Sequence, residues 1–190
     1  DAVFNVSSDK VIVISEIELK KISQLKTPNK VLGLFRIPDP KLIKKEGLVL
    51  ALDAINDPGN LGTIIRLCDW FGVEQLICSK ETVDCYNAKV VQASMGSLTR
   101  IQINYVDLNS YISVTTLPTF IADMNGKNVY KTQLPEDGVL IMGNEANGVS
   151  TEIKELAKSV ISIPRFGIKQ ETESLNVATA TAVLLSEFRR

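Results

Sequence analysis

The 190-residue sequence contains no histidine, and this absence excludes several kinds of chemistry. Ser-His-Asp and Cys-His catalysis, the usual zinc-binding sets and the commonest general base near neutral pH all need an imidazole. Any reaction must therefore depend on Arg, Lys, Glu, Asp, Ser, Asn or backbone groups. We expect no metal centre.

Cysteines and long apolar runs are scarce as well. Cys68, Cys78 and Cys85 are an odd number without CxxC spacing, which is typical of reduced thiols that fill a cytoplasmic protein's core. No run approaches the roughly eighteen apolar residues of a membrane span, and no segment reads as a signal peptide. The composition predicts a soluble, cytoplasmic protein with no membrane partner.

Charge is nearly balanced, and the net charge of −1 argues neither for nor against nucleic acid. Residues 1–46 carry nine Lys and Arg against six Asp and Glu, an excess of three, whereas the remainder carries twelve against sixteen. The lysines of this first part, including "KLIKK" (41–45), form either an ordinary solvated surface or a patch that faces RNA.

Residues 1–40 read as the end of a small unit followed by a linker. They hold an apolar run, "KVIVIS", a predicted helix, "EIELKKISQL", and a stretch in which Pro38 and Pro40 disfavour continuous helix. Residue 1 is Asp and not Met, so we expect a piece of a longer chain. Residues 41–190 form the second predicted domain.

From residue 47 onward, apolar runs alternate with helical patterns. Continuously apolar strands between helices indicate an α/β domain, with a mostly parallel sheet flanked by helices on both faces. The predicted strands are 48–53, 75–79, 100–106, 119–124, 138–143 and 159–164. The predicted helices are 60–71, 87–96, 107–114, 150–158 and 174–189.

Three strand-to-helix junctions carry candidate chemistry, and the first is "INDPGNLGTIIR" (55–66). We expect a Pro58-Gly59 turn, with Asn60 as the cap of the following helix. The apolar spacing over 61–68 gives that helix one buried face, so Arg66 points away from it.

This junction fails as a dinucleotide loop. The GxGxxG fingerprint is missing, because only Gly59 and Gly62 are present, and the next strand ends in "ICSK" without an acidic residue. A plain capped helix, with Arg66 paired to Asp69 on its surface, is the alternative to a functional loop.

The second junction is "LIMGNEANGVS" (140–150). An apolar strand runs into Gly143, and a polar turn with one carboxylate, Glu145, follows. Ser150 is expected to cap the next helix, with Glu152 in its first turn. The junction is either a plain turn or a place where Gly143 lets a ligand lie close to the backbone.

The third junction is "ISIPRFGIKQETESLNVATATAVLLSEF" (161–188). A loop of about ten residues separates Ile163-Pro164 from Ser174, the expected helix cap, and Asn176 follows near a ligand-friendly helix N-terminus. Arg165 and Lys169 either contact RNA or are solvated. The last helix is apolar nearly all round, so we expect it to pack on the domain and on a second subunit.

In this order, the three junctions resemble the motifs of the SpoU (TrmH-type) RNA ribose 2′-O-methyltransferases of the SPOUT superfamily. "NDPGNLGTIIR" is similar to the family's first motif, "LIMGNEANGVS" to its second, and "ISIP" with "ESLNVATATAVLLSE" to its third. The resemblance covers about residues 47–190. The loop between Pro164 and Ser174 is a few residues longer than in short family versions.

The resemblance implies a C-terminal deep trefoil knot, a homodimer formed through the knotted region, and an rRNA or tRNA substrate. It also implies that S-adenosylmethionine is bound between the second and third motif loops, and that residues 1–40 belong to an RNA-binding domain. Its implied cofactor-binding residues are Met142, Gly143, Asn144, Ile163, Pro164 and Leu175. Its implied catalytic and RNA-binding residues are Asn60, Arg66, Glu145, Ser174 and Asn176.

Methyl transfer to a ribose hydroxyl needs alignment of the reacting atoms and removal of a proton. The family assigns activation of the 2′-hydroxyl to the position of Arg66, although a guanidinium is a poor base. We hypothesise that Arg66 holds a phosphate or the forming alkoxide, and that Glu145 orients Asn60 or Arg66. The alternatives are a catalytically silent RNA- or ribosome-binding module of the same fold, and a nucleotide-dependent α/β enzyme of another type.

Overall fold

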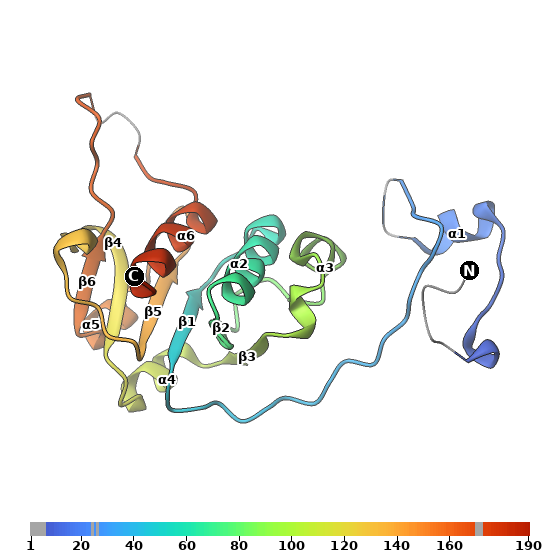
Figure 1. Ribbon diagram of the computed structural model, residues 1–190, viewed down its shortest axis with the longest axis horizontal. Coiled ribbons are helices and arrows are strands. Elements are labelled where there is room, and N and C mark those ends of the chain that lie inside the picture. Colours follow the sequence, from blue (N-terminus) through green and yellow to red (C-terminus); the bar gives the residue numbers. More distant parts are fainter. Residues whose placement is uncertain (1–6, 24, 26, 170–172) are drawn as a thin grey trace. The chain divides into compact units, whose positions relative to one another are not determined.

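The computed structural model describes residues 7–23, 25, 27–169 and 173–190 (Figure 1). The chain divides into two compact units, Asp1–Asp39 and Pro40–Arg190. No helix in the described part of the chain is long and apolar enough to cross a membrane.

The Asp1–Asp39 unit contains a short 3-10 helix, Ser8–Lys10, and one α-helix, α1 (Glu16–Ile22). Helix α1 begins where the sequence predicts, because Ser15 and Glu18 form a capping box. Leu19 is the one buried hydrophobic residue in the described part of this unit.

A six-stranded sheet forms the centre of the Pro40–Arg190 unit, in the order β3-β2-β1-β5-β4-β6. Every neighbouring pair is parallel, which confirms the predicted α/β class. The strands are β1 (Leu48–Asp53), β2 (Gln75–Ser79), β3 (Gln102–Val106), β4 (Thr119–Asn128), β5 (Gly138–Gly143) and β6 (Ser159–Ser162).

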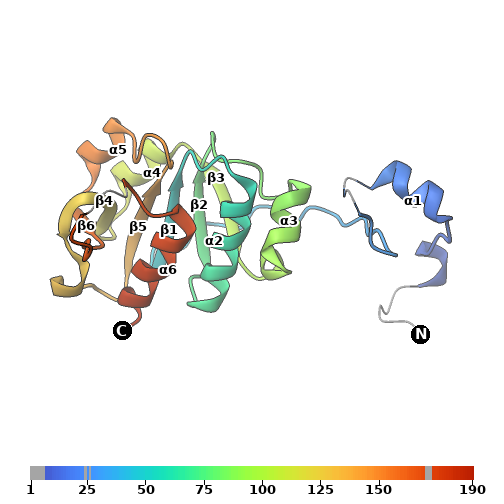
Figure 2. The ribbon, with the colours of Figure 1, turned by 90° about the horizontal axis from the view of Figure 1, so that it is seen from above.

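Five α-helices cover the sheet, three on one face and two on the other (Figure 2). Helices α2, α3 and α6 lie on one face, and α4 and α5 on the opposite face. The bounds are α2 (Pro58–Trp70), α3 (Ala88–Ser94), α4 (Leu108–Val114), α5 (Thr151–Leu156) and α6 (Val177–Phe188).

The two faces explain why the inner strands have continuous apolar runs. All six residues of β1 and all five of β2 are buried, and side chains alternate between two separate core clusters. Leu50 and Leu52 enter the cluster under α2 and α6, whereas Val49 and Ala51 enter the cluster under α4 and α5. Each face must therefore be covered for the sheet to be stable.

The strand order places a topological switch point between β1 and β5. The connection after β1 passes through α2 on one face, and the connection after β5 passes through α5 on the other face. Neighbouring parallel strands whose connections diverge in this way leave a crevice at their carboxyl ends, where open α/β sheets bind ligands. The first two junctions begin at this point.

The three cysteines are free and buried in the core, so they take the role of core residues that the sequence predicts. Burial raises the pKa of the Cys85 thiol to about 11, and it raises the pKa values of the Cys68 and Cys78 thiols well above their ordinary range.

The protonated, buried thiols predict slow reaction with a disulfide reagent. We expect Cys68, Cys78 and Cys85 in the native protein at pH 8 to react with Ellman's reagent at least about 100-fold more slowly than after unfolding in guanidinium chloride, because only an exposed thiolate attacks. A fast native reaction of one equivalent would contradict the burial.

Candidate active site

The first junction folds into α2, but its cap is not the predicted one. Asp57 is the N-cap, and its carboxylate accepts a hydrogen bond from the backbone N–H of Asn60 at 2.7 Å. Pro58 occupies the first helical position and does not form a turn before the helix. The prediction that Asn60 caps α2 is wrong, and the Asp-Pro pair was the available signal, since Pro is favoured directly after the cap. The side chain of Asn60 is thereby left for other contacts.

The cap of α6 also differs from the prediction. Asn176 caps the helix by accepting hydrogen bonds from the N–H groups of Ala178 and Thr179 at 3.0 and 3.2 Å. Ser174, the predicted cap, is exposed two residues earlier and forms no hydrogen bond within the described part of the chain. Asn176 therefore has a structural role as well as its place in the candidate site.

A chain of hydrogen bonds joins the three junctions to one another. The Nδ2 group of Asn176 donates to Oδ1 of Asn60 at 2.9 Å, across 116 positions of sequence. The Nδ2 group of Asn60 donates in turn to Oε1 of Glu145. Three residues that the sequence assigned to one site are thus in contact, one from each junction.

The direction of this chain is set at its α6 end. The helix N–H groups require an acceptor, so Asn176 must present Oδ1 to them and Nδ2 to Asn60. Asn60 must then present Oδ1 to Asn176 and its own Nδ2 to Glu145, whose ionised carboxylate is an acceptor only. Asn60 is therefore oriented from the α6 end, and Glu145 accepts its remaining amide donor.

The second junction forms a tight turn that is tied to the end of β1. Backbone hydrogen bonds in both directions join Asn144 to Gly148, at 3.0 and 2.8 Å. The side chain of Asn144 donates to the carbonyl of Ala54 at 2.7 Å and accepts from Ala146 N–H at 2.8 Å. Asn144 consequently shapes the turn that presents Glu145.

Two residues at the end of β1, Asp53 and Ala54, support this turn, and neither is among the predicted site residues. Buried Asp53 accepts a hydrogen bond from Ser150 N–H at 2.7 Å, whereas Ser150, the predicted cap of α5, has the N-cap position without a side-chain cap bond. Ala54 adopts a left-handed conformation with φ of 55°, and its N–H donates to Ser79 Oγ at 3.0 Å. A strained residue of this kind is typical of functional sites, but neither apolar spacing nor a turn motif indicates it.

Gly143 is required by a close approach of backbone to backbone. A Cβ atom at this position would lie 2.2 Å from the carbonyl carbon of Gly148 and 2.2 Å from Val149 N. The space that the sequence analysis offered to a ligand is therefore occupied by the turn of the same junction.

Arg66 lies exposed on α2 and has no hydrogen bond or ion pair within the described part of the chain. The alternative in which it pairs with Asp69 is wrong. The Nη2 group of Arg100 donates to Asp69 Oδ2 at 2.6 Å, and this contact, together with a hydrogen bond from Ser97, lowers the pKa of the Asp69 carboxyl. The guanidinium of Arg66 remains available to an anion.

The residues assigned to a cofactor differ in exposure. Met142 is buried in the core under α2 and α6, so its side chain is not available to a ligand. Ile163 and Pro164 are half-buried, and Leu175 is 51% exposed. Neither the backbone of Leu175 nor the side chain of Ser174 is hydrogen-bonded to another described residue. These groups can therefore serve a ligand that lies between the second and third junctions.

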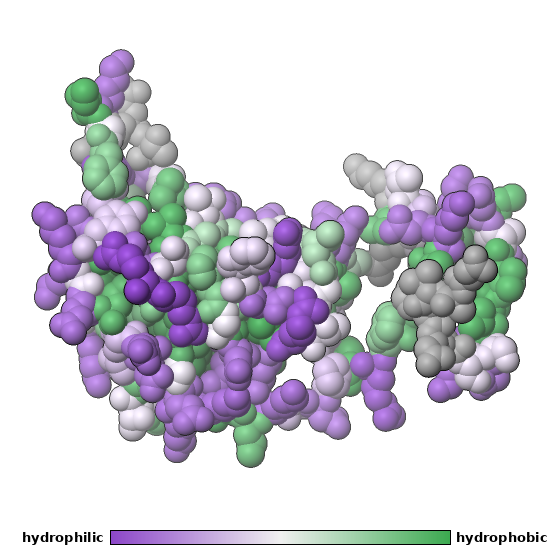
Figure 3. Space-filling view, in the orientation of Figure 1, coloured by the Kyte–Doolittle hydropathy of each residue, from purple (hydrophilic) through white to green (hydrophobic). Residues whose placement is uncertain are grey.

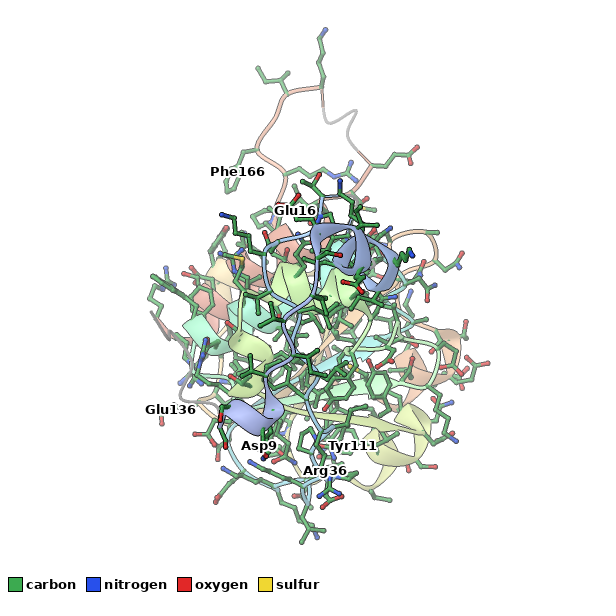
Figure 4. The ribbon with its side chains drawn as sticks, turned by 90° about the vertical axis from the view of Figure 1, so that its right-hand side faces the viewer. Asp9, Glu16, Arg36, Tyr111, Glu136 and Phe166 are labelled. Atoms are coloured by element: carbon green, nitrogen blue, oxygen red, sulfur yellow. The ribbon has the colours of Figure 1, made fainter. Side chains whose placement is uncertain are left out.

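The described residues that follow β6, up to Lys169, stand out from the domain (Figure 3). Arg165 closes the base of this segment by donating to the carbonyl of Glu173 at 2.7 Å and by contacting Met124 Sδ at 2.9 Å. Phe166 and Ile168 are almost fully exposed beyond this closure, and Figure 4 shows Phe166 on the projecting segment. Lys169 is also exposed.

The model of the SpoU rRNA Methylase family matches residues 47–186. RlmP of Bacillus subtilis (strain 168), a 23S rRNA (guanosine(2553)-2′-O)-methyltransferase, is 31% identical over 183 residues. That match covers 93% of this chain and 71% of the relative.

Two solved structures have the same fold. A protein of the TrmH family from Porphyromonas gingivalis has a TM-score of 0.79 and 36% identity, over 94% of this chain and 73% of that chain. An AdoMet-bound rRNA methyltransferase from Sinorhizobium meliloti has a TM-score of 0.70 and 33% identity, over 75% of this chain and 56% of that chain. The chain thus spans 71%, 73% and 56% of the lengths of these three proteins.

The packing around Gly143 predicts that an added methyl group is costly there. We expect Gly143→Ala to lower the free energy of unfolding by about 3 kcal/mol, because the backbone of the turn must move to admit Cβ. Gly167→Ala is the matched control, since no atom lies within 4 Å of its Cβ position. Urea denaturation measures both, and equal midpoints would contradict the close approach.

The two roles of Asn176 can be separated by two substitutions. Asn176→Ala removes the cap and should cost about 1 kcal/mol of stability, whereas Asn176→Asp keeps a capping oxygen and should unfold close to the native midpoint. Asn176→Asp nevertheless loses the Nδ2 donor to Asn60. Thermal and urea unfolding report the difference, and equal destabilisation by Asp and Ala would show that the cap contributes nothing.

Proposed function

The chain belongs to the SpoU rRNA methylase family, and on that premise we propose that it transfers a methyl group from S-adenosylmethionine to a ribose 2′-hydroxyl of ribosomal RNA. The relatives' names support ribose 2′-O-methylation of 23S rRNA. Guanosine is the nucleoside that we infer from the same names, and transfer RNA is the competing substrate.

The observation that carries the proposal is the hydrogen-bond chain from Asn176 through Asn60 to Glu145. It joins all three motifs at the carboxyl ends of parallel strands, where α/β sheets bind their ligands. A scaffold that had lost its activity would have no need to keep three distant polar side chains in contact. We therefore favour an active enzyme over the silent RNA-binding module.

The chain's own groups fit S-adenosylmethionine on the third-junction side of the site. The backbone of Leu175 and the Ser174 hydroxyl, which form no hydrogen bond with a described residue, and the half-buried Ile163-Pro164 offer both polar and apolar contacts to a nucleoside. Gly143 contributes by letting the second junction pack tightly beside them. The bound cofactor supplies a methyl group on a sulfonium sulfur, which needs no metal and no histidine.

Arg66 is the group that we assign to the RNA. Its guanidinium is exposed and unpaired within the described part of the chain, so it can hold the phosphate beside the reacting ribose or stabilise the forming alkoxide. A guanidinium is a poor base, so we assign the hydroxyl proton to the phosphate or to water. The contact between Asn60 and Glu145 ties the first turn of α2, the helix that carries Arg66, to the second junction.

We propose two partners for the chain: a second copy of itself and RNA. We propose that a second copy packs on α6, because its partly buried side chains Ala180, Ala182 and Val183 are small and apolar. The knot of the family would then lie in the same C-terminal region. We assign the Asp1–Asp39 unit to RNA binding, on account of the basic excess in residues 1–46.

Replacing Arg66 by Lys tests the assignment. Lys keeps the positive charge but loses the planar fork that holds a phosphate, so we expect transfer of labelled methyl groups to unmodified RNA to fall about 100-fold. The Kd for S-adenosylmethionine, measured by calorimetry, should not change. Arg190→Lys, at an exposed position far along the sequence, is the control. Transfer near the native level in Arg66→Lys would remove Arg66 from the mechanism.

A further inference from the structure

Residues 41–47, which lead into β1, are held along the amino ends of the strands by side chains of the sheet. We name this segment the entry strap. In β3, Gln102 donates to the carbonyls of Lys41 and Leu42 at 3.2 and 2.8 Å. Asn104 of the same strand donates to the Lys41 carbonyl at 2.9 Å. Two amide side chains thus fix the first residues of the strap.

The centre of the strap is held by a buried amide. Gln75 of β2 is 2% exposed, and its Oε1 accepts from Lys44 N–H at 2.7 Å while its Nε2 donates to the Lys44 carbonyl at 3.3 Å. No other described residue pairs with this side chain. Release of the strap would leave a buried amide without partners, which is unfavourable.

The last residues of the strap are attached as well. Gly47 N–H donates to Asp137 Oδ1 at 3.1 Å, and Ile43 packs against the core cluster under α4 and α5. The exposed pair of Lys44 and Glu74, 2.6 Å apart, contributes little by comparison. The strap is therefore anchored from Lys41 to Gly47.

The segment before the strap behaves differently. The described residues 27–40 form no hydrogen bond with any described residue. Pro38 and Pro40 fix the backbone next to the strap in an extended form. Residues 27–40, which we name the tether, are thus unanchored, and the anchored strap begins at Lys41.

We propose that the entry strap sets the point at which the Asp1–Asp39 unit is tethered, and thereby tunes the affinity of the whole chain for RNA. The inference rests on the proposed function, in which that unit binds the same RNA as the catalytic unit. Release of residues 41–46 would lengthen the tether by up to about 20 Å. A longer tether lowers the effective concentration of the second binding unit. Gln102, Asn104 and Gln75 are positioning residues in this view.

The test uses the full chain with Gln75→Ala, Gln102→Ala and Asn104→Ala combined, so that every amide side chain that holds residues 41–44 is removed. Asn109→Ala, which changes an exposed amide on α4 that forms no hydrogen bond with a described residue, is the matched control. Limited trypsin digestion is followed at Lys41, Lys44 and Lys45 of the strap, with Lys30 as the internal reference. Methyl transfer to an unmodified 23S rRNA transcript gives kcat and the KM for RNA, and calorimetry gives the Kd for S-adenosylmethionine.

We expect faster cleavage within the strap, unchanged cleavage after Lys30, and a KM for RNA raised about three-fold. The kcat and the Kd for S-adenosylmethionine should match those of Asn109→Ala. Unchanged cleavage of the strap, or faster cleavage with an unchanged KM, would overturn the inference. Absence of methyl transfer by the native chain would instead refute the proposed function, and the digestion would still report whether the strap is anchored as described.

Discussion

The exposed N–H groups at the start of α6 are the constraint on which the candidate site depends. They need an acceptor, and Asn176 provides it with its carbonyl oxygen. An amide whose oxygen is used in this way can present only its nitrogen to the other side. The orientations of Asn60 and then of Glu145 follow from that single requirement. The free N–H groups at the start of one helix thereby determine how three side chains from distant motifs are oriented.

The sheet brings these motifs together before any side chain contributes. Strands β1 and β5 are neighbours, although 84 residues (54–137) lie between Asp53, the last residue of β1, and Gly138, the first residue of β5. Their connections leave on opposite faces, so the first and second junctions meet at the same edge of the sheet. Asp53 and Ala54 then fasten the second junction to the first through Ser150 and Asn144. The strand order therefore brings the first and second junctions close together, and the hydrogen bonds of Asp53 and Ala54 fix their relative positions.

Most of the fold could be predicted from the sequence because apolar periodicity is a local signal. Leu48–Asp53, Gln75–Ser79 and Gly138–Gly143 have the predicted bounds, since each is a buried parallel strand with a continuous apolar run. The N-cap residues of the helices were harder to predict, because several polar residues precede each helix and only one of them accepts hydrogen bonds from its first N–H groups. Asp57 and Asn176 do so in place of Asn60 and Ser174. The left-handed Ala54 and the buried Gln75 depend on contacts across the fold, so no local pattern reveals them.

The hydrogen bonds between Gln75 and the backbone of Lys44 also affect the choice of the first residue in a fragment or fusion of the Pro40–Arg190 unit. The family match begins at residue 47, and a boundary placed there discards both backbone partners of a buried side chain. The Pro40–Arg190 unit is larger than the matched region, because its amino edge is completed by backbone that carries no motif. A fragment or fusion that begins at Pro40 retains this edge, whereas one that begins at Gly47 exposes the interior of the sheet to water.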